Sequence, residues 1–276
     1  MVSGSIVLYK TAPEMVSEVI ESFFRGCSGS RKLFLVDNSP TDDLKRLVQL
    51  YPSQTVYIHN PANTGYGSAH NIAIRRSFEE GFKYHVVLNP DLSFDSETIN
   101  GLESFMDEHP EIGLCIPDMF DYHTGERKAG ARLLPSPFDG FFRRFMSKSS
   151  ITRKRDREYL LKDADYSKPF SAPYISGSFM FFRNEHLKVI GLFDEHFFMY
   201  YEDTDISRRM YCKFGNSFVP NLSARHIGAR ESYKSKKMLF VTLKSAVYYF
   251  NKYGWFFDRQ RMNINKTVLN SIYNGK

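Results

Sequence analysis

One carboxylate stands where a parallel sheet would present it to a ligand. Asn89-Pro90-Asp91 directly follows an apolar run at residues 84–88, and Pro90 blocks further strand pairing. Mg²⁺ needs oxygen ligands and usually takes only one or two protein carboxylates, with phosphate oxygens and water completing its shell. The motif therefore predicts a cation-bound nucleoside diphosphate at Asp91 or, as the plainer alternative, a turn that ends a strand.

A second acidic group follows an aromatic stretch at residues 197–201. Glu202 and Asp203 would lie at the edge of an apolar pocket, where desolvation raises the pKa of a carboxyl group toward that of a useful general base. The structural alternative is that Asp203 caps a helix starting at Thr204. Asp205, in the first turn of that helix, then complements the helix dipole.

A histidine and a glycine segment add two weaker indications. His226 follows a predicted strand, and a neutral imidazole can complete a cation site that also contains carboxylates. Arg230 is suited to clamping phosphate, although a lone histidine is more often structural. In Ser176-Gly177-Ser178, a glycine between two hydroxyl residues allows a ligand to approach the backbone closely.

The elements that must position these groups alternate along residues 1–120. Short apolar strands are predicted at 5–9, 32–37, 55–58, 84–88 and 112–116, and helices at 13–23, 42–48, 69–82 and 96–108. This alternation predicts βαβ units and a mostly parallel sheet buried on both faces. Ligands of such sheets bind outside the carboxyl ends of the strands.

The rest of the chain is less regular. Residues 135–165 form a basic segment without periodicity, which we interpret as a mobile excursion that is helical in part. A strand at 175–182, helices at 184–190 and 204–214, and a strand at 217–220 follow. From residue 225 onward there are eleven lysines and arginines against two acids, so a mildly acidic domain precedes a basic, helical C-terminal extension.

Composition excludes several classes of protein. The chain has 276 residues, of which 42% are hydrophobic and 25% charged, so disordered and collagen-like chains are excluded. Its three cysteines, Cys27, Cys115 and Cys212, lie far apart, form no metal-binding spacing, and fit burial in a reducing compartment. Neither a secretory signal nor a run long enough to span a bilayer is predicted, which favours a cytoplasmic location.

Taken together, these motifs resemble the inverting nucleotide-sugar transferases of glycosyltransferase family 2. The resemblance covers roughly residues 5–235 and is most specific at residues 175–180 and 191–205. It extends to Leu88-Asn89-Pro90-Asp91 and to the segment 63–71, which favour the bacterial rhamnosyltransferase branch that builds O-antigen and related surface polysaccharides. The implied fold is α/β of the GT-A type, a Rossmann-like, mostly parallel sheet flanked by helices.

The resemblance also implies roles for individual residues. Asp203 matches the catalytic base, with Glu202 beside it, and Asp91 and His226 match the ligands of a divalent cation, Mg²⁺ or Mn²⁺. Asp37 matches the residue that binds the nucleobase. The implied donor-binding residues are Tyr9, Lys10, Asp37, Asn38, Gly65, Asn71, Asn89, Pro90 and Arg230. The implied acceptor-side residues are Ser176, Gly177 and Ser178.

One position departs from the family's Asp-x-Asp pattern. Asn89 replaces the first acid, so the site loses one negative charge and its dependence on the metal is in question. The implied catalytic domain is residues 1–231, with a nucleotide-binding half (about 1–120) and an acceptor-side half (about 121–231). The basic, amphipathic helical extension is residues 232–276.

The implied activity is transfer of L-rhamnose from dTDP-L-rhamnose to a polyprenyl-diphosphate-linked glycan. A UDP-sugar-dependent galactofuranosyl- or glucosyltransferase remains an alternative. The basic extension fits a peripheral contact with the cytoplasmic face of the inner membrane. A nucleotidyltransferase is disfavoured because Tyr9-Lys10-Thr11 lacks a Gly-rich phosphate loop, and a basic nucleic-acid- or glycan-binding module because no nucleic-acid-binding motif is present.

Overall fold

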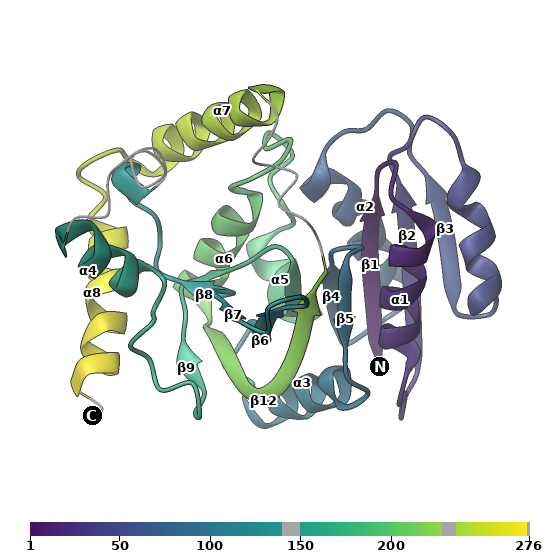
Figure 1. The fold of residues 1–276 in the computed structure, drawn as a ribbon, viewed down its shortest axis with the longest axis horizontal. Coiled ribbons are helices and arrows are strands. Elements are labelled where there is room, and N and C mark those ends of the chain that lie inside the picture. Colours follow the sequence, from purple (N-terminus) through teal and green to yellow (C-terminus); the bar gives the residue numbers. More distant parts are fainter. Residues whose placement is uncertain (140–149, 228–235, 275–276) are drawn as a thin grey trace.

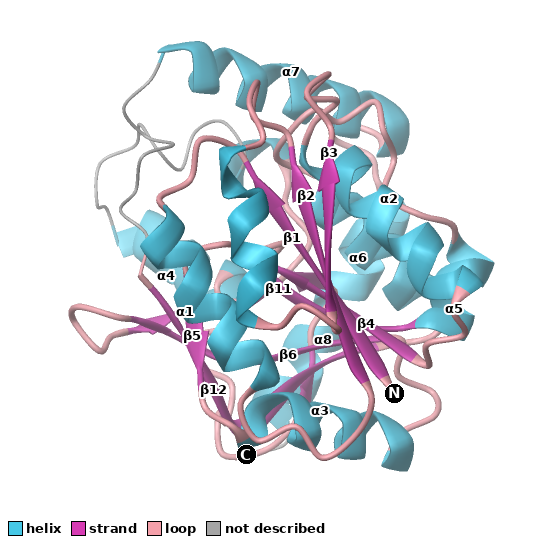
Figure 2. Cartoon of the chain, turned by 90° about the vertical axis from the view of Figure 1, so that its right-hand side faces the viewer, coloured by secondary structure: helices cyan, strands magenta, loops and turns pink. Residues whose placement is uncertain are grey.

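The computed structural model describes residues 1–139, 150–227 and 236–274. A central mixed sheet runs through the molecule, and helices cover both of its faces (Figures 1 and 2). The strand order is β3-β2-β1-β4-β11-β6-β12-β5, with β7 at β6 and β9 at β12. The expected α/β architecture with a mostly parallel sheet is confirmed.

The nucleotide-side half contains four parallel strands. These are β1 (Val2–Leu8), β2 (Arg31–Asp37), β3 (Thr55–His59) and β4 (Tyr84–Leu88). Their connections are α1 (Pro13–Phe24), the 3₁₀ helix η1 (Asp43–Leu50) and α2 (Tyr66–Glu79). Because strand side chains alternate between faces, Ile6 and Leu35 pack with α1 on one side, whereas Val7 and Val36 pack with α2 on the other.

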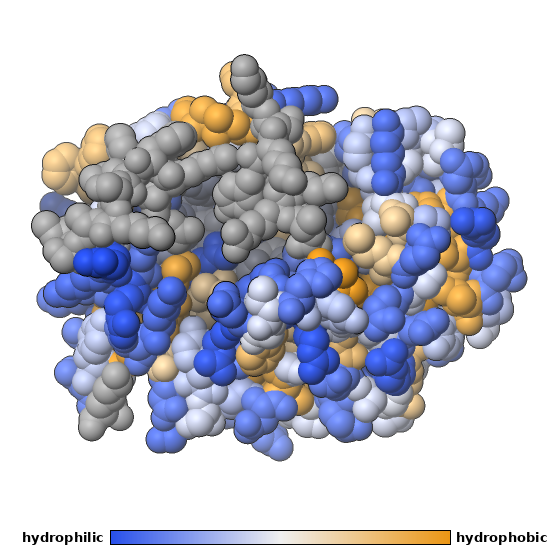
Figure 3. All heavy atoms as spheres, viewed as in Figure 1, coloured by the Kyte–Doolittle hydropathy of each residue, from blue (hydrophilic) through white to orange (hydrophobic). Residues whose placement is uncertain are grey.

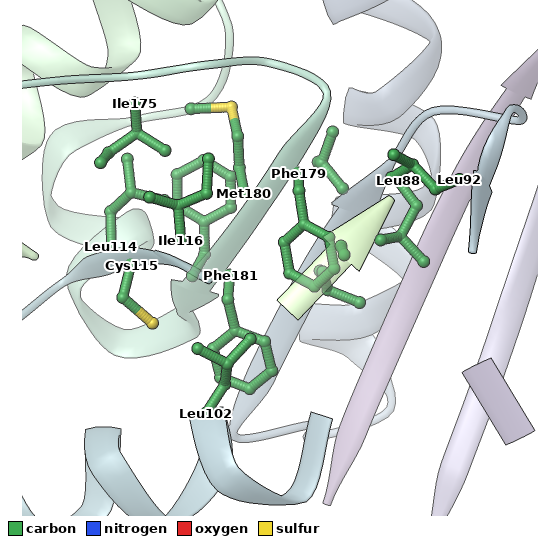
Figure 4. Packing of buried hydrophobic residues seen from close by; sticks show 14 of the residues in the cluster. Leu88, Leu92, Leu102, Leu114, Cys115, Ile116, Ile175, Phe179, Met180 and Phe181 are labelled. Atoms are coloured by element: carbon green, nitrogen blue, oxygen red, sulfur yellow. The ribbon is translucent and has the colours of Figure 1, made fainter. Parts of the chain in front are cut away.

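The second half adds antiparallel strands to the sheet. β11 (Phe179–Arg183) runs antiparallel to β4 and to β6 (Leu114–Asp121), and β12 (Asn216–His226) runs parallel to β6 and antiparallel to β5 (Leu92–Phe94). Short strands are β7 (Arg127–Lys128), β8 (Ala131–Arg132), β9 (Phe170–Ser171) and β10 (Tyr174–Ile175). The helices are α3 (Glu97–Glu108), α5 (Asn184–Ile190) and α6 (Glu202–Lys213). Phe179 and Phe181 of β11 fill the core between the sheet and α3 (Figure 4).

Three further helices lie at the C-terminal side of the molecule (Figure 1). They are α4 (Ser150–Tyr159), α7 (Lys236–Tyr253) and α8 (Arg259–Asn274). Tyr249 and Phe250 of α7 are buried against Phe197, and Val268 of α8 belongs to the main core cluster. The C-terminal helices are therefore packed onto the α/β part through buried apolar side chains.

The described structure differs from the sequence predictions in several places. The strand expected at 175–182 is divided by a turn at residues 176–178, and the helix expected at 42–48 is a 3₁₀ helix. Helix α8 was not predicted as a separate helix, because its apolar positions are interrupted by polar residues at nearly every turn. In the basic segment 135–165 the expected helix is present as α4, while residues 140–149 lie outside the described part.

Candidate active site

Three strand ends meet at one edge of the sheet. Leu8 of β1 pairs in register with Asp37 of β2, and Ile6 with Leu88 of β4. The segments that follow these strands therefore emerge side by side, where ligands of parallel sheets bind. Tyr9 is exposed at this edge, and Lys10 adopts a left-handed conformation with φ 52°.

Hydrogen bonds within the protein fix the orientation of the Asp37 carboxylate. Its Oδ1 accepts a hydrogen bond from the Ser39 backbone N–H at 2.9 Å, and its Oδ2 accepts one from the Tyr57 hydroxyl at 2.7 Å. Burial, then the bond to Asp37, raises the pKa of Tyr57, so this hydroxyl stays a donor. The Ser39 hydroxyl accepts from the Lys10 backbone N–H at 2.8 Å.

A glycine joins the nucleotide side to the acidic segment of the chain. Gly65 has φ 109°, and a Cβ at this position would lie 2.4 Å from the carbonyl oxygen of Phe198. The next residue, Tyr66, donates its backbone N–H to that carbonyl at 2.8 Å. Asn38 donates its side-chain amide to the Gly65 carbonyl at 3.5 Å. Only glycine permits this close approach between the two segments.

Tyr66 lies at the centre of the site, although sequence analysis did not select it. Its hydroxyl is 2.9 Å from Oδ1 of Asn89 and 2.8 Å from the carbonyl oxygen of Gly177. The Asn89 backbone N–H donates to the Ser178 carbonyl at 2.9 Å. Burial, followed by the charges of Glu202 and Asp203, raises the pKa of Tyr66 well above its usual value, so the hydroxyl remains protonated. Its position directly after Gly65 was the only indication in the sequence.

Antiparallel pairing of β12 with β5 brings His226 to Asp91. His226 is level with Leu92 in this pairing, and its Nε2 lies 3.4 Å from Oδ1 of Asp91 and 3.4 Å from Nδ2 of Asn89. Oδ1 of Asp91 is buried and has no hydrogen-bond partner within the described part of the chain. Burial lowers the pKa of His226 against the opposing effect of Asp91, which favours the neutral imidazole.

These two side chains fit a divalent cation. An unpartnered carboxylate oxygen beside a neutral imidazole is a suitable donor set for Mn²⁺ or Mg²⁺. Among residues 1–139, 150–227 and 236–274 there is no group of three or more His, Cys, Asp or Glu side chains that would hold an ion by itself. The pair therefore fits an ion whose remaining ligands come from a diphosphate and water.

Asp203 is anchored to the acceptor-side loop. Its Oδ2 accepts hydrogen bonds from the Gly177 backbone N–H at 2.9 Å and from the Tyr174 hydroxyl at 3.0 Å. Its Oδ1 accepts from the Thr204 backbone N–H at 2.8 Å. The flanking serine hydroxyls, Ser176 and Ser178, lie 3.2 Å apart. The carboxylate is therefore oriented by groups from two separate parts of the chain.

The turn that delivers Asp203 is strained. Tyr200 and Tyr201 have φ values of 67° and 66°, a left-handed conformation that bulky residues adopt rarely and at a cost of about 1–3 kcal/mol each. Helix α7 holds this turn, because the Tyr201 ring packs on those of Tyr249 and Phe250 at 5.3 and 6.0 Å. Such strain is concentrated at functional sites.

Glu202 is in a different state from its neighbour. Its side chain is buried, and among the described residues its Oε2 has no hydrogen-bond partner. Burial, with the charge of Asp203 second, raises the pKa of Glu202 well above its usual value. Glu202 therefore keeps its proton to a higher pH than an ordinary glutamate, and Asp203 is the better candidate for a base.

Two of the expected donor-binding residues need separate comment. Asn71 is fully buried and its amide bonds Phe193 and Glu195, at 2.9–3.0 Å. Asn71 thus positions the segment after α5, and its expected role in donor binding stays a prediction. Arg230 lies outside the described residues.

The architecture is that of the GT-A glycosyltransferases. The family model described as glycosyl transferase family 2 matches residues 5–191, about two thirds of the chain. The chain belongs to glycosyl transferase family 2. Both the fold and the family that the sequence motifs indicated are thereby confirmed.

Two curated relatives are similar over most of the chain. The low-salt glycan biosynthesis hexosyltransferase Agl10 of Haloferax volcanii is 27% identical over 205 residues, covering 74% of this chain and 59% of that protein. The N-acetylglucosaminyl-diphospho-decaprenol L-rhamnosyltransferase of Mycobacterium tuberculosis is 28% identical over 211 residues, covering 70% and 66%. The matched part of the chain thus spans less than two thirds of the length of either relative.

Solved structures share the fold at low identity. GalNAc-T7 with UDP, GalNAc and Mn²⁺ aligns with a TM-score of 0.64 at 17% identity, covering 86% of this chain and 44% of that chain. S. aureus TarS 1–349 in complex with UDP aligns with a TM-score of 0.60 at 16% identity, covering 99% and 72%. The mannosyltransferase PcManGT from Pyrobaculum calidifontis, solved with GDP-Man and Mn²⁺, aligns with a TM-score of 0.59 at 12% identity, covering 100% and 75%.

Proposed function

We propose that this chain is an inverting glycosyltransferase that moves a sugar from a nucleoside diphosphate to an acceptor hydroxyl. The observation that carries the proposal is a continuous chain of contacts between Asp203 and the pair formed by Asp91 and His226. Gly177 bonds Asp203 and, through the Tyr66 hydroxyl, meets Asn89, beside which Asp91 and His226 lie together. A base and a diphosphate-binding pair are thus held on opposite ends of one cluster.

In this mechanism Asp203 accepts the proton of the acceptor hydroxyl. The oxygen attacks the anomeric carbon from the face opposite the diphosphate, so the bond to the leaving oxygen breaks and the configuration inverts. The anchoring bonds from Gly177 and Tyr174 keep Oδ2 oriented, which is the contribution of positioning to rate. A cation held by Asp91 and His226 would stabilise the negative charge that gathers on the leaving diphosphate.

The favoured donor is dTDP-L-rhamnose. The similarity to the L-rhamnosyltransferase of Mycobacterium tuberculosis supports it, at 28% identity. A UDP-linked hexose is the alternative, since the Haloferax volcanii relative is named only as a hexosyltransferase. The proposed binding site of the nucleobase is the buried Asp37 corner, together with Asn38, Tyr9 and Lys10.

The favoured acceptor is a polyprenyl-diphosphate-linked glycan at a membrane surface. No described helix combines the length and hydropathy needed to cross a bilayer. Helix α7, however, exposes Phe240, Leu243 and Val247 along one stripe, with Lys237 and Lys244 also exposed. Figure 3 shows hydrophobic surface at the top of the molecule, where Figure 1 places α7. This face fits an anionic headgroup layer, and flotation with anionic vesicles at low and high salt tests it. Absence of salt-sensitive binding would contradict the membrane contact.

The experiment that tests the proposed function compares two aspartates. Asp203→Asn should retain binding of dTDP or UDP, measured by calorimetry with Mn²⁺, and lose transfer by about 10²–10⁴-fold, because the general base is gone. Asp43→Asn makes the same change in an exposed first-turn acid of η1 and should leave both unchanged. Near-full transfer by the Asp203 variant would refute the assignment of the base, and absence of any nucleoside diphosphate binding would refute the transferase.

A further inference from the structure

A cavity of about 900 Å³ lies outside the proposed active site and is lined by residues of α4, α8 and the segment 133–139. Figure 1 shows α4 and α8 next to each other. The apolar wall includes Leu133, Met262 and Leu269. The polar wall includes the cations Arg155, Arg261 and Lys266 and the acids Asp139 and Glu158. The wall is fixed in place, because Asn265 bonds both the backbone N–H and the carbonyl of Leu134, at 3.0 and 2.9 Å.

Arg261 is a buried cation that forms no ion pair within the described part of the chain. Its residue is 5% exposed, and no carboxylate of the described residues lies within 4.0 Å of its guanidinium. Among those residues, its guanidinium hydrogen bonds go to the carbonyl oxygens of Pro135 and Trp255, both at 3.5 Å. Burial lowers the pKa of Arg261, and the more distant charge of Asp258 opposes this effect.

A second buried arginine, Arg208, has the carboxylate partner that Arg261 lacks among the described residues. Arg208 of α6 is 2% exposed and binds both oxygens of Asp258, at 2.6 and 2.8 Å. Asp258 also accepts the backbone N–H of Arg261 at 3.0 Å, so this carboxylate is already occupied. Buried charges are normally paired, so Arg261 leaves donors for an anion that enters the cavity.

The cavity wall is linked to the acceptor side of the proposed active site through neighbouring residues. Leu133 follows β8, and Arg132 of β8 pairs in register with Tyr174 of β10 and lies over its ring at 5.4 Å. The Tyr174 hydroxyl bonds Asp203. Arg132 and Tyr174 thus connect the cavity wall with the proposed base.

We propose that this cavity binds the diphosphate of a lipid-linked acceptor, with Arg261 and Lys266 as the anion-binding residues and the leucine wall against the first part of the lipid. The inference rests on the proposed function and assigns a binding site to the acceptor proposed there. The donor diphosphate is already assigned to Asp91 and His226, so a separate cationic site requires a separate anion. Its apolar wall distinguishes a lipid diphosphate from free pyrophosphate.

The test uses the full chain and farnesyl diphosphate as the probe, measured by calorimetry. Arg261→Gln should weaken binding at least tenfold, and Lys266→Gln by a smaller factor, because charge-assisted hydrogen bonds are lost. Arg259→Gln removes an exposed charge from the same helix outside the cavity and should leave binding unchanged. Farnesol, without the diphosphate, and pyrophosphate, without the lipid, should each bind more weakly than the probe.

The outcomes separate this proposal from the proposed function. Unchanged probe binding in Arg261→Gln and Lys266→Gln would overturn the cavity site, and so would competition between the probe and dTDP. Pyrophosphate binding as tight as that of the probe would overturn the lipid part. If Arg261→Gln fails to fold, Arg261→Lys and Lys266→Gln carry the test. The proposed function itself is judged by dTDP or UDP binding, which the cavity variants should not change.

Discussion

Two clusters of buried polar side chains, each containing histidine, differ in how completely they are bonded. The sheet-core cluster consists of Ser3, Ser5, His70, Ser77 and His85, all fully buried between β1, β4 and α2. Its members bond one another at 2.6–2.8 Å. In the candidate active site, by contrast, Asp91, Glu202 and His226 each have one buried polar atom that finds no partner among the described residues.

A low histidine pKa does not distinguish the two clusters. Burial lowers the pKa of His85 to about 3, and it lowers the pKa of His226 as well. The two histidines differ in their hydrogen-bond partners. Both ring nitrogens of His85 are bonded to serines. Nδ1 of His226 has no partner among the described residues, and its Nε2 faces Asp91. The sheet-core cluster has one such atom, Nε2 of His70, which lies where this cluster meets Tyr66 of the site.

Exchanging the two histidines for alanine gives the largest expected contrast. His85→Ala should destabilise the fold by about 2–5 kcal/mol, because Ser3 and Ser5 each lose a buried hydrogen bond and a cavity opens. His226→Ala should cost little stability and weaken nucleoside diphosphate binding in Mn²⁺ by at least about tenfold. Denaturant unfolding and calorimetry measure the two effects, and a large stability loss in the His226 variant would erase the distinction.

A glycine substitution disturbs the site cluster alone. In Gly177→Ala the new Cβ would lie 3.0 Å from Cβ of Asp203 and 3.2 Å from its Oδ2. Displacing the base by a fraction of an ångström to about 1 Å should reduce transfer by roughly 10²-fold, while the sheet core and its unfolding midpoint stay nearly unchanged. Gly29→Ala is the matched control, since nothing lies within 4 Å of its Cβ. Equal activities of the two variants would show that the loop tolerates movement.

The sequence predicted the sheet-core half better than the site. Continuous apolar strands and helical periodicity located β1, β2 and β4, and hence the strand ends at Asp37 and Asp91. His226 reached Asp91 through the pairing of β12 with β5, a register across more than a hundred residues that local patterns do not encode. The family resemblance, and not periodicity, supplied that pair.

Other site features depend on tertiary contacts that no spacing reveals. Tyr66 became central only because Gly65 lets its loop approach Phe198. The left-handed turn at Tyr200 and Tyr201 is held by rings of α7, about fifty residues later in the chain. Arg261 likewise lacks an ion pair within the described residues because Arg208 binds both carboxylate oxygens of Asp258. Such competition between side chains is decided by packing, which propensities do not contain.

The smallest expected effect concerns the protonation of Glu202 and is visible in its dependence on pH. Its folded-state pKa is raised, by burial first, above the value of about 4.3 expected in the unfolded chain. Between those two values the folded protein binds more protons than the unfolded chain, so stability falls as pH rises. Glu202→Gln removes this loss and should raise the unfolding midpoint near pH 7, with the gain disappearing at about pH 4 and below.

Thermal unfolding between pH 4 and 8 measures this gain, with Glu97→Gln, an exposed first-turn acid of α3, as the control without such a dependence. A gain that grew on acidification would contradict a raised pKa of Glu202. Transfer activity gives the second criterion, because Asp203 is the proposed base and Glu202→Gln should therefore keep most of the activity. If the glutamine variant were as inactive as Asp203→Asn, Glu202 would take part in removing the proton of the acceptor hydroxyl. Its oxygen without a partner among the described residues would then serve catalysis.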